Sequence, residues 1–133
     1  DGDGNLRCYF ASGAMYVPGM GSGAGTYCMK YNTTTKQVTY DTSSARYKDN
    51  IRDSVYGLND VLKMRSAMFE YKDDGRTDVG LIAEELNTIV PELVAKNEQG
   101  QPDAVSYDRL VSVLIKAVQD LNDKFEAYKS AHP

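Results

Sequence analysis

The sequence predicts an α+β fold with a β-rich amino-terminal stalk segment, a small mixed α/β region and a long carboxy-terminal helix. Residues 1–42 hold seven of the eleven glycines and five of the ten tyrosines, but only three acidic and three basic side chains. In residues 43–133 the charge rises, and the spacing of apolar residues changes from two towards three and four. A chain of 133 residues fits one compact domain or a small domain joined to an elongated piece, which excludes a large two-domain enzyme.

The amino-terminal segment is predicted to form β structure. Strand-like runs at 27–31 and 37–40 flank the polar loop 32–36, a pattern typical of a hairpin. The glycine-rich stretch 17–25 before it has almost nothing to bury, and it lacks the lysine of a phosphate loop. Isolated hairpins are marginal in water, so we expect this segment to pack on the second half or on other copies of the chain.

The second half begins with shorter elements. Ser54 is expected to cap a helix that ends near Met64. Two strands, 67–71 and 78–82, are expected to flank a turn at 72–76. A short helix is then predicted over 83–90, closed by a proline, and a polar loop is predicted over 97–103.

The last helix gives the clearest pattern, and the cap is expected at residues 106–108. Its apolar residues follow spacings of four, three and four and then a gap of seven: Leu110, Leu114, Ala117, Leu121 and Tyr128. This describes a short heptad seam, loosened where Lys124 falls at a core-type position. A helix packed on its own domain would show similar spacing, so both a coiled coil and a packed helix remain open.

Composition excludes several classes of function. The net charge of −4 comes with no basic stripe, so no nucleic acid partner is expected. No apolar run approaches the roughly 18 residues of a membrane span, and no secretory signal is visible at the start. Cys8 and Cys28 lack the spacing of a zinc site or redox pair, and the single histidine, His132, is next to last. No metal and no cofactor are therefore expected.

Three acidic motifs are interpreted as surface charge. Residues 1–5 imitate the start of a calcium loop, but Leu6 and Ser12 stand where that loop needs glycine and glutamate. The adjacent pairs 73–74 and 84–85 could be proposed as acid and base. Neighbouring side chains diverge on a helix and are solvated in a turn, so neither pair is placed to share a proton.

The junction between the two halves, residues 42–51, offers different chemistry. Ser43 supplies a hydroxyl nucleophile, and Lys48 supplies an amine five residues later. On a helix these side chains would point about 140° apart, so a working pair needs an irregular or extended link. A serine hydroxyl is a poor nucleophile unless a base activates it, and the only candidate base is a lysine made neutral by burial. A plain serine-rich linker is the alternative.

The same junction resembles the signature of a known family, the self-cleaving carboxy-terminal intramolecular chaperones of phage tail fibres and endosialidase-type tailspikes. The signature runs Ser-Asp-x-Arg-x-Lys-x-x-Ile, and the matching positions are Ser43, Ser44, Ala45, Arg46, Tyr47, Lys48 and Ile51. Residues 79–85 and 90–94 resemble the family's central block, and 105–110 resembles its closing block. The likeness spans about residues 43–128 in the family's order.

The resemblance implies an intertwined homotrimer that guides upstream β-structured fibre strands of the same chain into register and then cuts itself off. The family's catalytic serine and lysine fall on Ser43 and Lys48, and the severed bond is Thr42–Ser43. Residues 1–42 are then the end of the mature fibre, kept in the virion, and residues 43–133 are the chaperone released after cleavage. Assembly is expected in the cytoplasm of a bacterial host.

One departure from the signature matters: Ser44 replaces the usual aspartate and adds a second hydroxyl. Ser43 is favoured as nucleophile because it keeps the five-residue interval to Lys48. Arg46 is interpreted as structural, because a guanidinium cannot act as a base.

Two other functions remain open. The first is a permanent, non-cleaving trimeric fibre tip that binds a host-cell receptor. The second is a membrane-bound animal transcription factor with a related self-cleaving module, which needs DNA-binding and membrane-spanning segments that this sequence does not show.

Overall fold

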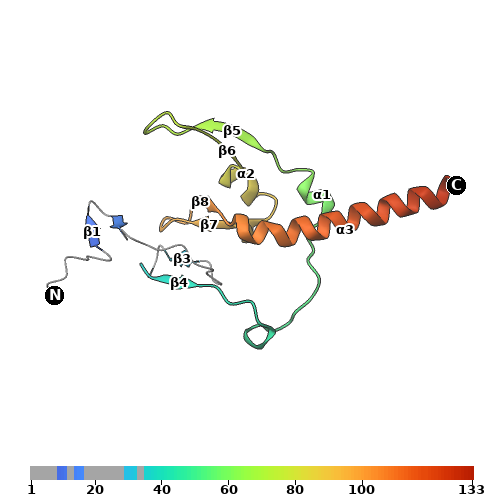
Figure 1. The fold of residues 1–133 in the computed structure, drawn as a ribbon, viewed down its shortest axis with the longest axis horizontal. Coiled ribbons are helices and arrows are strands. Elements are labelled where there is room, and N and C mark those ends of the chain that lie inside the picture. Colours follow the sequence, from blue (N-terminus) through green and yellow to red (C-terminus); the bar gives the residue numbers. More distant parts are fainter. Residues whose placement is uncertain (1–8, 12–13, 17–28, 33–34) are drawn as a thin grey trace, which may run out of the picture.

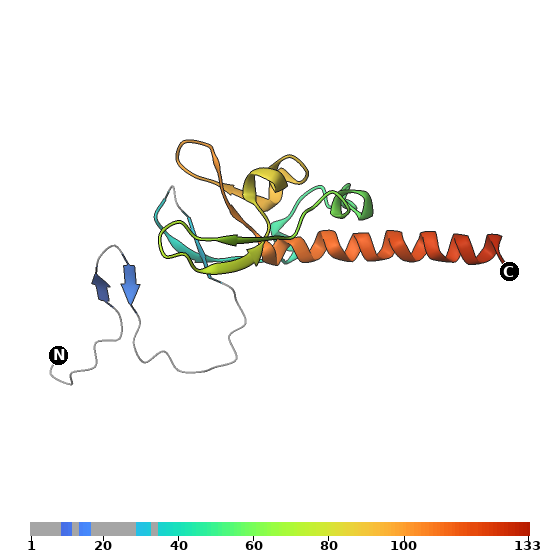
Figure 2. The same ribbon diagram turned by 90° about the horizontal axis from the view of Figure 1, so that it is seen from above.

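The structure is a computed structural model that describes residues 9–11, 14–16, 29–32 and 35–133. A small mixed body lies at one end of the long helix α3 (Tyr107–Ala131), which extends well beyond it to the carboxy terminus (Figures 1 and 2). The predicted α+β class is confirmed: the described strands pair as antiparallel two-stranded sheets with short helices between them, before α3. Cys8, Cys28, the calcium-like motif and the glycine-rich stretch lie outside the described residues.

The described part of the amino-terminal segment forms two hairpins. Strand β1 (Tyr9–Ala11) pairs with β2 (Ala14–Tyr16), and β3 (Met29–Tyr31) pairs with β4 (Val38–Tyr40). The second hairpin was predicted, and its loop closes through hydrogen bonds from Lys36 N–H to Asn32 O and from Asn32 N–H to Gln37 O. Lys36 takes the left-handed conformation that this turn requires, with φ of 59°.

The first helix of the second half is shorter than predicted. α1 spans only Leu58–Val61, and Gly57 is its N-cap residue. Ser54 does not cap it: its hydroxyl instead makes a local turn with the backbone of Tyr56. The Asp60 carboxylate accepts a hydrogen bond from Gly57 N–H, and this bond sets the helix start three residues later than the sequence suggested.

The next hairpin was predicted, and the one after it was missed. β5 (Ala67–Glu70) pairs with β6 (Thr77–Gly80), followed by α2 (Ala83–Asn87) and the 3₁₀ turn η2 (Pro91–Leu93). The predicted polar loop is in fact the tip of a hairpin between β7 (Val94–Lys96) and β8 (Pro102–Val105). These strands have three and four residues, which is too short to show an alternating pattern of apolar and polar side chains. A proline such as Pro102 is also disfavoured within a strand.

The core lies where these elements meet the first half of α3. Leu86, Val90, Leu93 and Val113 form the buried cluster, which Ile89, Val105, Leu110 and neighbouring apolar side chains surround. α1 packs along α3 further towards its carboxy end, and the Leu58 N–H donates to the Asp120 carboxylate there. The core therefore fixes α3 and the short elements as one body.

The heptad seam predicted on α3 is in the wrong register. Leu110 and Ala117 face the chain's own core, and Ala117 is only 5% exposed. The exposed stripe instead follows unbroken spacings of three and four: Val111, Leu114, Val118, Leu121, Phe125 and Tyr128. Its members are 41–64% exposed, and Phe125 takes the place that Lys124 interrupted in the predicted seam. One face of α3 thus packs against the core of its own chain, and another face carries exposed apolar residues with the spacing of a coiled coil.

Candidate functional site

An extended arm carries the predicted site residues. It leaves β4, runs through the 3₁₀ turn η1 (Ala45–Tyr47) and returns to the body at α1 (Figure 1). All residues from 41 to 55 are exposed in the single chain. The signature motif therefore lies on a segment that the core of its own chain does not cover.

The Lys48 ammonium donates a hydrogen bond to Ser43 Oγ, with a nitrogen–oxygen distance of 2.8 Å. The connection between the two is irregular, as expected: Ser44 and Lys48 are both extended, at ψ of 140° and 136°, and η1 makes one turn between them. Hydrogen bonds from Tyr47 N–H to Ser44 O and from Lys48 N–H to Ala45 O close that turn. This turn brings side chains five residues apart back to the same side.

The other signature positions lie nearby without joining this contact. Ser44 occupies the position before η1, and its side chain makes no capping hydrogen bond. The Arg46 guanidinium lies over the ring of Tyr47, 5.0 Å from its centroid. The structure thus joins Ser43 rather than Ser44 to the lysine.

A groove of about 640 Å³ opens between the arm and the body. The arm contributes Thr42, Ser43 and Lys48, and the body contributes η2 and the first turns of α3. A second hollow of about 530 Å³ lies along residues 48–56. Because the arm spans open space, the Ser43–Lys48 pair is accessible to solvent within one chain.

Tyr56 and Glu92 line the same groove and were not singled out from the sequence. A hydrogen bond between the Tyr56 hydroxyl and the Glu92 carboxylate raises the pKa of Tyr56, and burial acts in the same direction. The tyrosine hydroxyl therefore stays neutral at physiological pH and donates to the carboxylate. Nothing in the spacing of residues 56 and 92 could have paired them, because the body fold alone brings them together.

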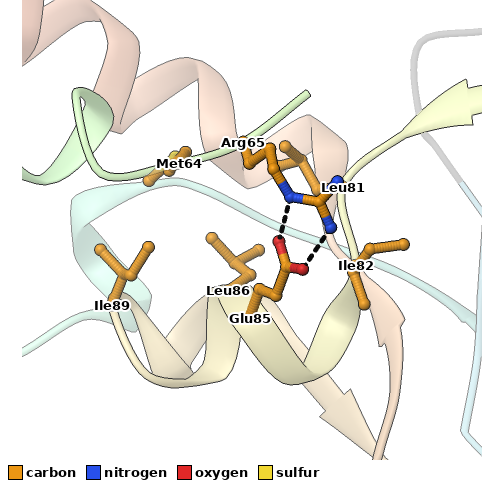
Figure 3. A pocket seen from close by; sticks show the side chains of 7 residues that line it. All are labelled: Met64, Arg65, Leu81, Ile82, Glu85, Leu86 and Ile89. Atoms are coloured by element: carbon orange, nitrogen blue, oxygen red, sulfur yellow. Dashed lines mark hydrogen bonds and ion pairs between the residues drawn. The ribbon is translucent and has the colours of Figure 1, made fainter. Parts of the chain in front are cut away.

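The adjacent pairs at 73–74 and 84–85 are exposed, as the interpretation as surface charge expected, and Asp73, Asp74 and Glu85 accept hydrogen bonds within the chain. Both nitrogens of the Arg65 side chain that face Glu85 donate to its carboxylate, with Nε to Oε2 at 3.2 Å (Figure 3). This bond lowers the pKa of Glu85 and makes it a poor proton donor near neutrality. The pocket beside this pair, about 10 Å³, has room for about one water molecule. Asp73 and Asp74 accept backbone N–H groups in the β5–β6 turn.

No group of three or more metal-ligating side chains occurs within the residues that the structure describes. His132 follows the end of α3, where its ring stacks on Tyr128. Of the helices in the described ranges, none combines the length and apolar character needed to cross a membrane.

The comparisons with known proteins give one finding. Residues 43–95 match the family model of the S74 peptidases, described as the chaperone of endosialidase. The match begins at Ser43 and runs through Lys48 to the middle of β7, so the predicted family resemblance is confirmed over this range. No curated protein and no solved structure matches the chain.

Proposed function

We propose that this chain, whose residues 43–95 match the endosialidase-chaperone family, is an intramolecular chaperone that cuts itself at Thr42–Ser43. Residues 43–133 drive trimerisation and folding of the upstream fibre or tailspike in the host cytoplasm and are then released. Residues 1–42 remain as the end of the mature fibre. The observation that carries the proposal is the 2.8 Å contact between Ser43 and Lys48 at the first positions of the family match.

The first chemical step makes the serine nucleophilic. With its amine neutral, Lys48 accepts the hydroxyl proton of Ser43, and Oγ attacks the carbonyl carbon of Thr42. Backbone donors have to stabilise the oxyanion that forms on the Thr42 carbonyl oxygen. The resulting adduct is a five-membered ring closed through the Ser43 nitrogen and Oγ.

The second step breaks the peptide bond. The carbon–nitrogen bond opens, the Lys48 ammonium returns its proton to the leaving Ser43 nitrogen, and an ester joins the Thr42 carbonyl to Ser43 Oγ. Water then hydrolyses the ester to a Thr42 carboxylate and a free Ser43 amino terminus. Each chain reacts once, because the nucleophile leaves with the product.

Assembly supplies what one chain lacks. A solvated lysine amine carries its proton at neutral pH, whereas the mechanism needs a neutral amine, which burial favours. Lys48 is exposed in the single chain, so we infer that neighbouring copies cover the arm and remove this amine from water. Cutting then follows correct association.

The exposed stripe on α3 supports association through a coiled coil. Val111 and Val118 alternate with Leu114 and Leu121 in the spacing of a and d positions. Apolar side chains outside α3 are uncovered too: Met68 and Val79 pair across β5–β6 at 78% and 63% exposure. Valine at a with leucine at d also suits two strands, so the threefold state rests on the family, and a direct mass measurement tests it.

Mass spectrometry of freshly expressed chains tests the cut. The wild-type chain should give fragments of 42 and 91 residues, whereas Ser43→Ala and Lys48→Ala should remain intact. Ser44→Ala is the matched control and should cleave like wild type, because its hydroxyl is one residue away from the lysine contact. A wild-type chain that stays whole as a trimer would favour the rival function, a permanent fibre tip that binds a receptor.

A further inference from the structure

The hairpin β3–β4 lies on the fibre side of the proposed cut, and its apolar side chains contribute little to its attachment. Met29, Tyr31, Val38 and Tyr40 are 51–66% exposed. The hairpin is nevertheless held against the carboxy-terminal part of the chain. Charged side chains make this attachment at both ends of the hairpin.

The first ionic contact is at the start of α3. Lys30 forms a hydrogen-bonded ion pair with Asp108, and its ammonium lies 4.0 Å from Asp41 Oδ2. The Arg109 guanidinium lies 3.4 Å from the same Asp41 oxygen. Lys30 and Asp41 of the hairpin segment thus face side chains of complementary charge on the helix, Asp108 and Arg109. Asp108 also suits the first turn of a helix, where the helix dipole favours negative charge.

The second ionic contact is at the other end of the hairpin. Lys36, in the β3–β4 loop, lies 2.5 Å from Glu98 in the β7–β8 loop. The hydrogen bond between them raises the pKa of Lys36 and lowers that of Glu98. Similarly, the hydrogen bond from Lys30 lowers the pKa of Asp108. Glu98 and Asp108 are therefore ionised and paired at physiological pH.

We propose that the first turn of α3 and the β7–β8 loop form an electrostatic docking surface for residues 29–41. After cleavage at Thr42–Ser43 this surface keeps the amino-terminal product on the chaperone at low ionic strength, and the product leaves when salt screens the pairs. The proposal rests on the proposed function. It states that residues 1–42 and 43–133 separate in a salt-sensitive step that is distinct from cleavage.

The balance of forces follows from the exposure of these groups. Each side chain in the clasp, defined as Lys30, Lys36, Asp41, Glu98, Asp108 and Arg109, is 30–60% exposed. Exposed pairs are individually weak, and screening shortens their reach from about 8 Å at physiological salt to about 3 Å at 1 M. In a trimer three such clasps act together, so retention is stronger than one clasp gives.

The docking is tested without cleavage in the intact Ser43→Ala chain. Hydrogen exchange of the β3 and β4 amides should rise about five- to tenfold between about 0.05 M and about 1 M NaCl, with β5–β6 unchanged. Lys30→Glu should cause the same rise at low salt, and Lys30→Glu with Asp108→Lys should exchange more slowly than Lys30→Glu alone. Lys72→Glu, the same charge change in the exposed β5–β6 turn, should have no effect.

The release is tested in the wild-type chain by gel filtration after cleavage. The two fragments should elute together at low salt and separately at about 1 M NaCl. Fragments that stay together at high salt, or β3–β4 amides whose exchange ignores salt, would overturn the docking surface. A wild-type chain that never cleaves would refute the proposed function instead, and the exchange measurement on Ser43→Ala would still decide the docking.

Discussion

Replacing Gly80 with alanine should weaken the contact between the end of β6 and Tyr107 at the start of α3. Gly80 ends β6 opposite the buried Ala67, and an added Cβ would lie 2.5 Å from the Tyr107 hydroxyl oxygen. The next contacts, with the rings of Phe69 and Tyr107, are 3.6 Å away and ordinary. The conflict is therefore confined to one hydroxyl group, which accepts a hydrogen bond from Leu81 N–H at 2.8 Å.

The size of the effect follows from three contributions. Displacing the Tyr107 hydroxyl gives up a hydrogen bond with a net value of about 0.5–1.5 kcal/mol. Forcing the ring outward adds about 1 kcal/mol, the lower end of the overpacking range, because Tyr107 is half-exposed and its ring has room to move. Alanine offsets about 0.4–1 kcal/mol, because it restricts the unfolded chain and the glycine does not use a positive φ. We expect Gly80→Ala to lower the free energy of unfolding by about 0.5–2 kcal/mol.

The matched background is Tyr107→Phe, which removes the hydroxyl alone. This variant should cost about 1 kcal/mol by itself. In its background Gly80→Ala meets only ordinary contacts and should be neutral or slightly stabilising. Urea denaturation in the Ser43→Ala chain measures both, at one fixed protein concentration because association contributes to stability. Equal costs in the two backgrounds, within about 0.5 kcal/mol, would show that the hydroxyl contact is not the cause.

Three further outcomes follow. Val118→Asp places a charge in the exposed seam and should leave the chain monomeric and uncut, whereas Gln119→Asp, also exposed and adjacent, should leave the mass measured by light scattering unchanged. Gly57→Ala would place its Cβ against the Asp120 carboxylate and should release α1 from α3, seen as faster hydrogen exchange of α1 at unchanged α2 exchange. The Lys116 ammonium and the Leu58 N–H both donate hydrogen bonds to the Asp120 carboxylate and lower its pKa. The contribution of Asp120 to stability is therefore present above the ordinary pKa of about 3.9, and it is lost as pH falls through the lower pKa of the folded state. Asp120→Asn should therefore reduce the fall of the denaturation midpoint at acid pH. An equally steep fall in this variant would contradict the role assigned to Asp120.

Sequence patterning predicted the elements whose signals are local. The β3–β4 hairpin and the long helix beginning after Ser106 are where alternation and capping placed them. The helix start at Gly57 depends on Asp60 and on a distant contact with Asp120, so local capping preference at Ser54 misplaced it. The β7–β8 strands are held by their packing on α2 rather than by their own composition.

The seam on α3 shows why periodicity alone could not choose a face. The predicted seam shares Leu114, Leu121 and Tyr128 with the exposed stripe, and it takes Leu110 and Ala117 from the face that packs on the core. The face with Leu110 and Ala117 is covered by α1, η2 and neighbouring core residues, which the sequence cannot place in advance. Once that face is assigned to the core, six exposed apolar positions with an unbroken heptad spacing remain, and Ile115 is exposed beside them: Val111, Leu114, Val118, Leu121, Phe125 and Tyr128.

The candidate site was predictable only in part for a related reason. Serine and lysine five residues apart require an irregular link, and that requirement could be stated from the sequence. The partners that surround them could not, because Glu92 and Arg109 come from elements more than forty residues away. The roles expected of Ser43 and Lys48 came from the resemblance to the family, whereas the groove that they line depends on the body fold.

The exposure of the arm connects the chemistry to the assembly. Within one chain, the Ser43 hydroxyl accepts a hydrogen bond from Lys48, which is the reverse of the proton transfer that the mechanism needs. Reversing it requires loss of water around the amine, and among the residues that the structure describes the whole arm, residues 41–55, is exposed. Exposed apolar side chains lie on α3, on β5–β6 and on the arm itself, where Ile51 and Val55 are 69% and 81% exposed. Burial of these surfaces between copies would also remove water from around the Lys48 amine. We therefore predict that a chain that has not associated stays uncut at Thr42–Ser43.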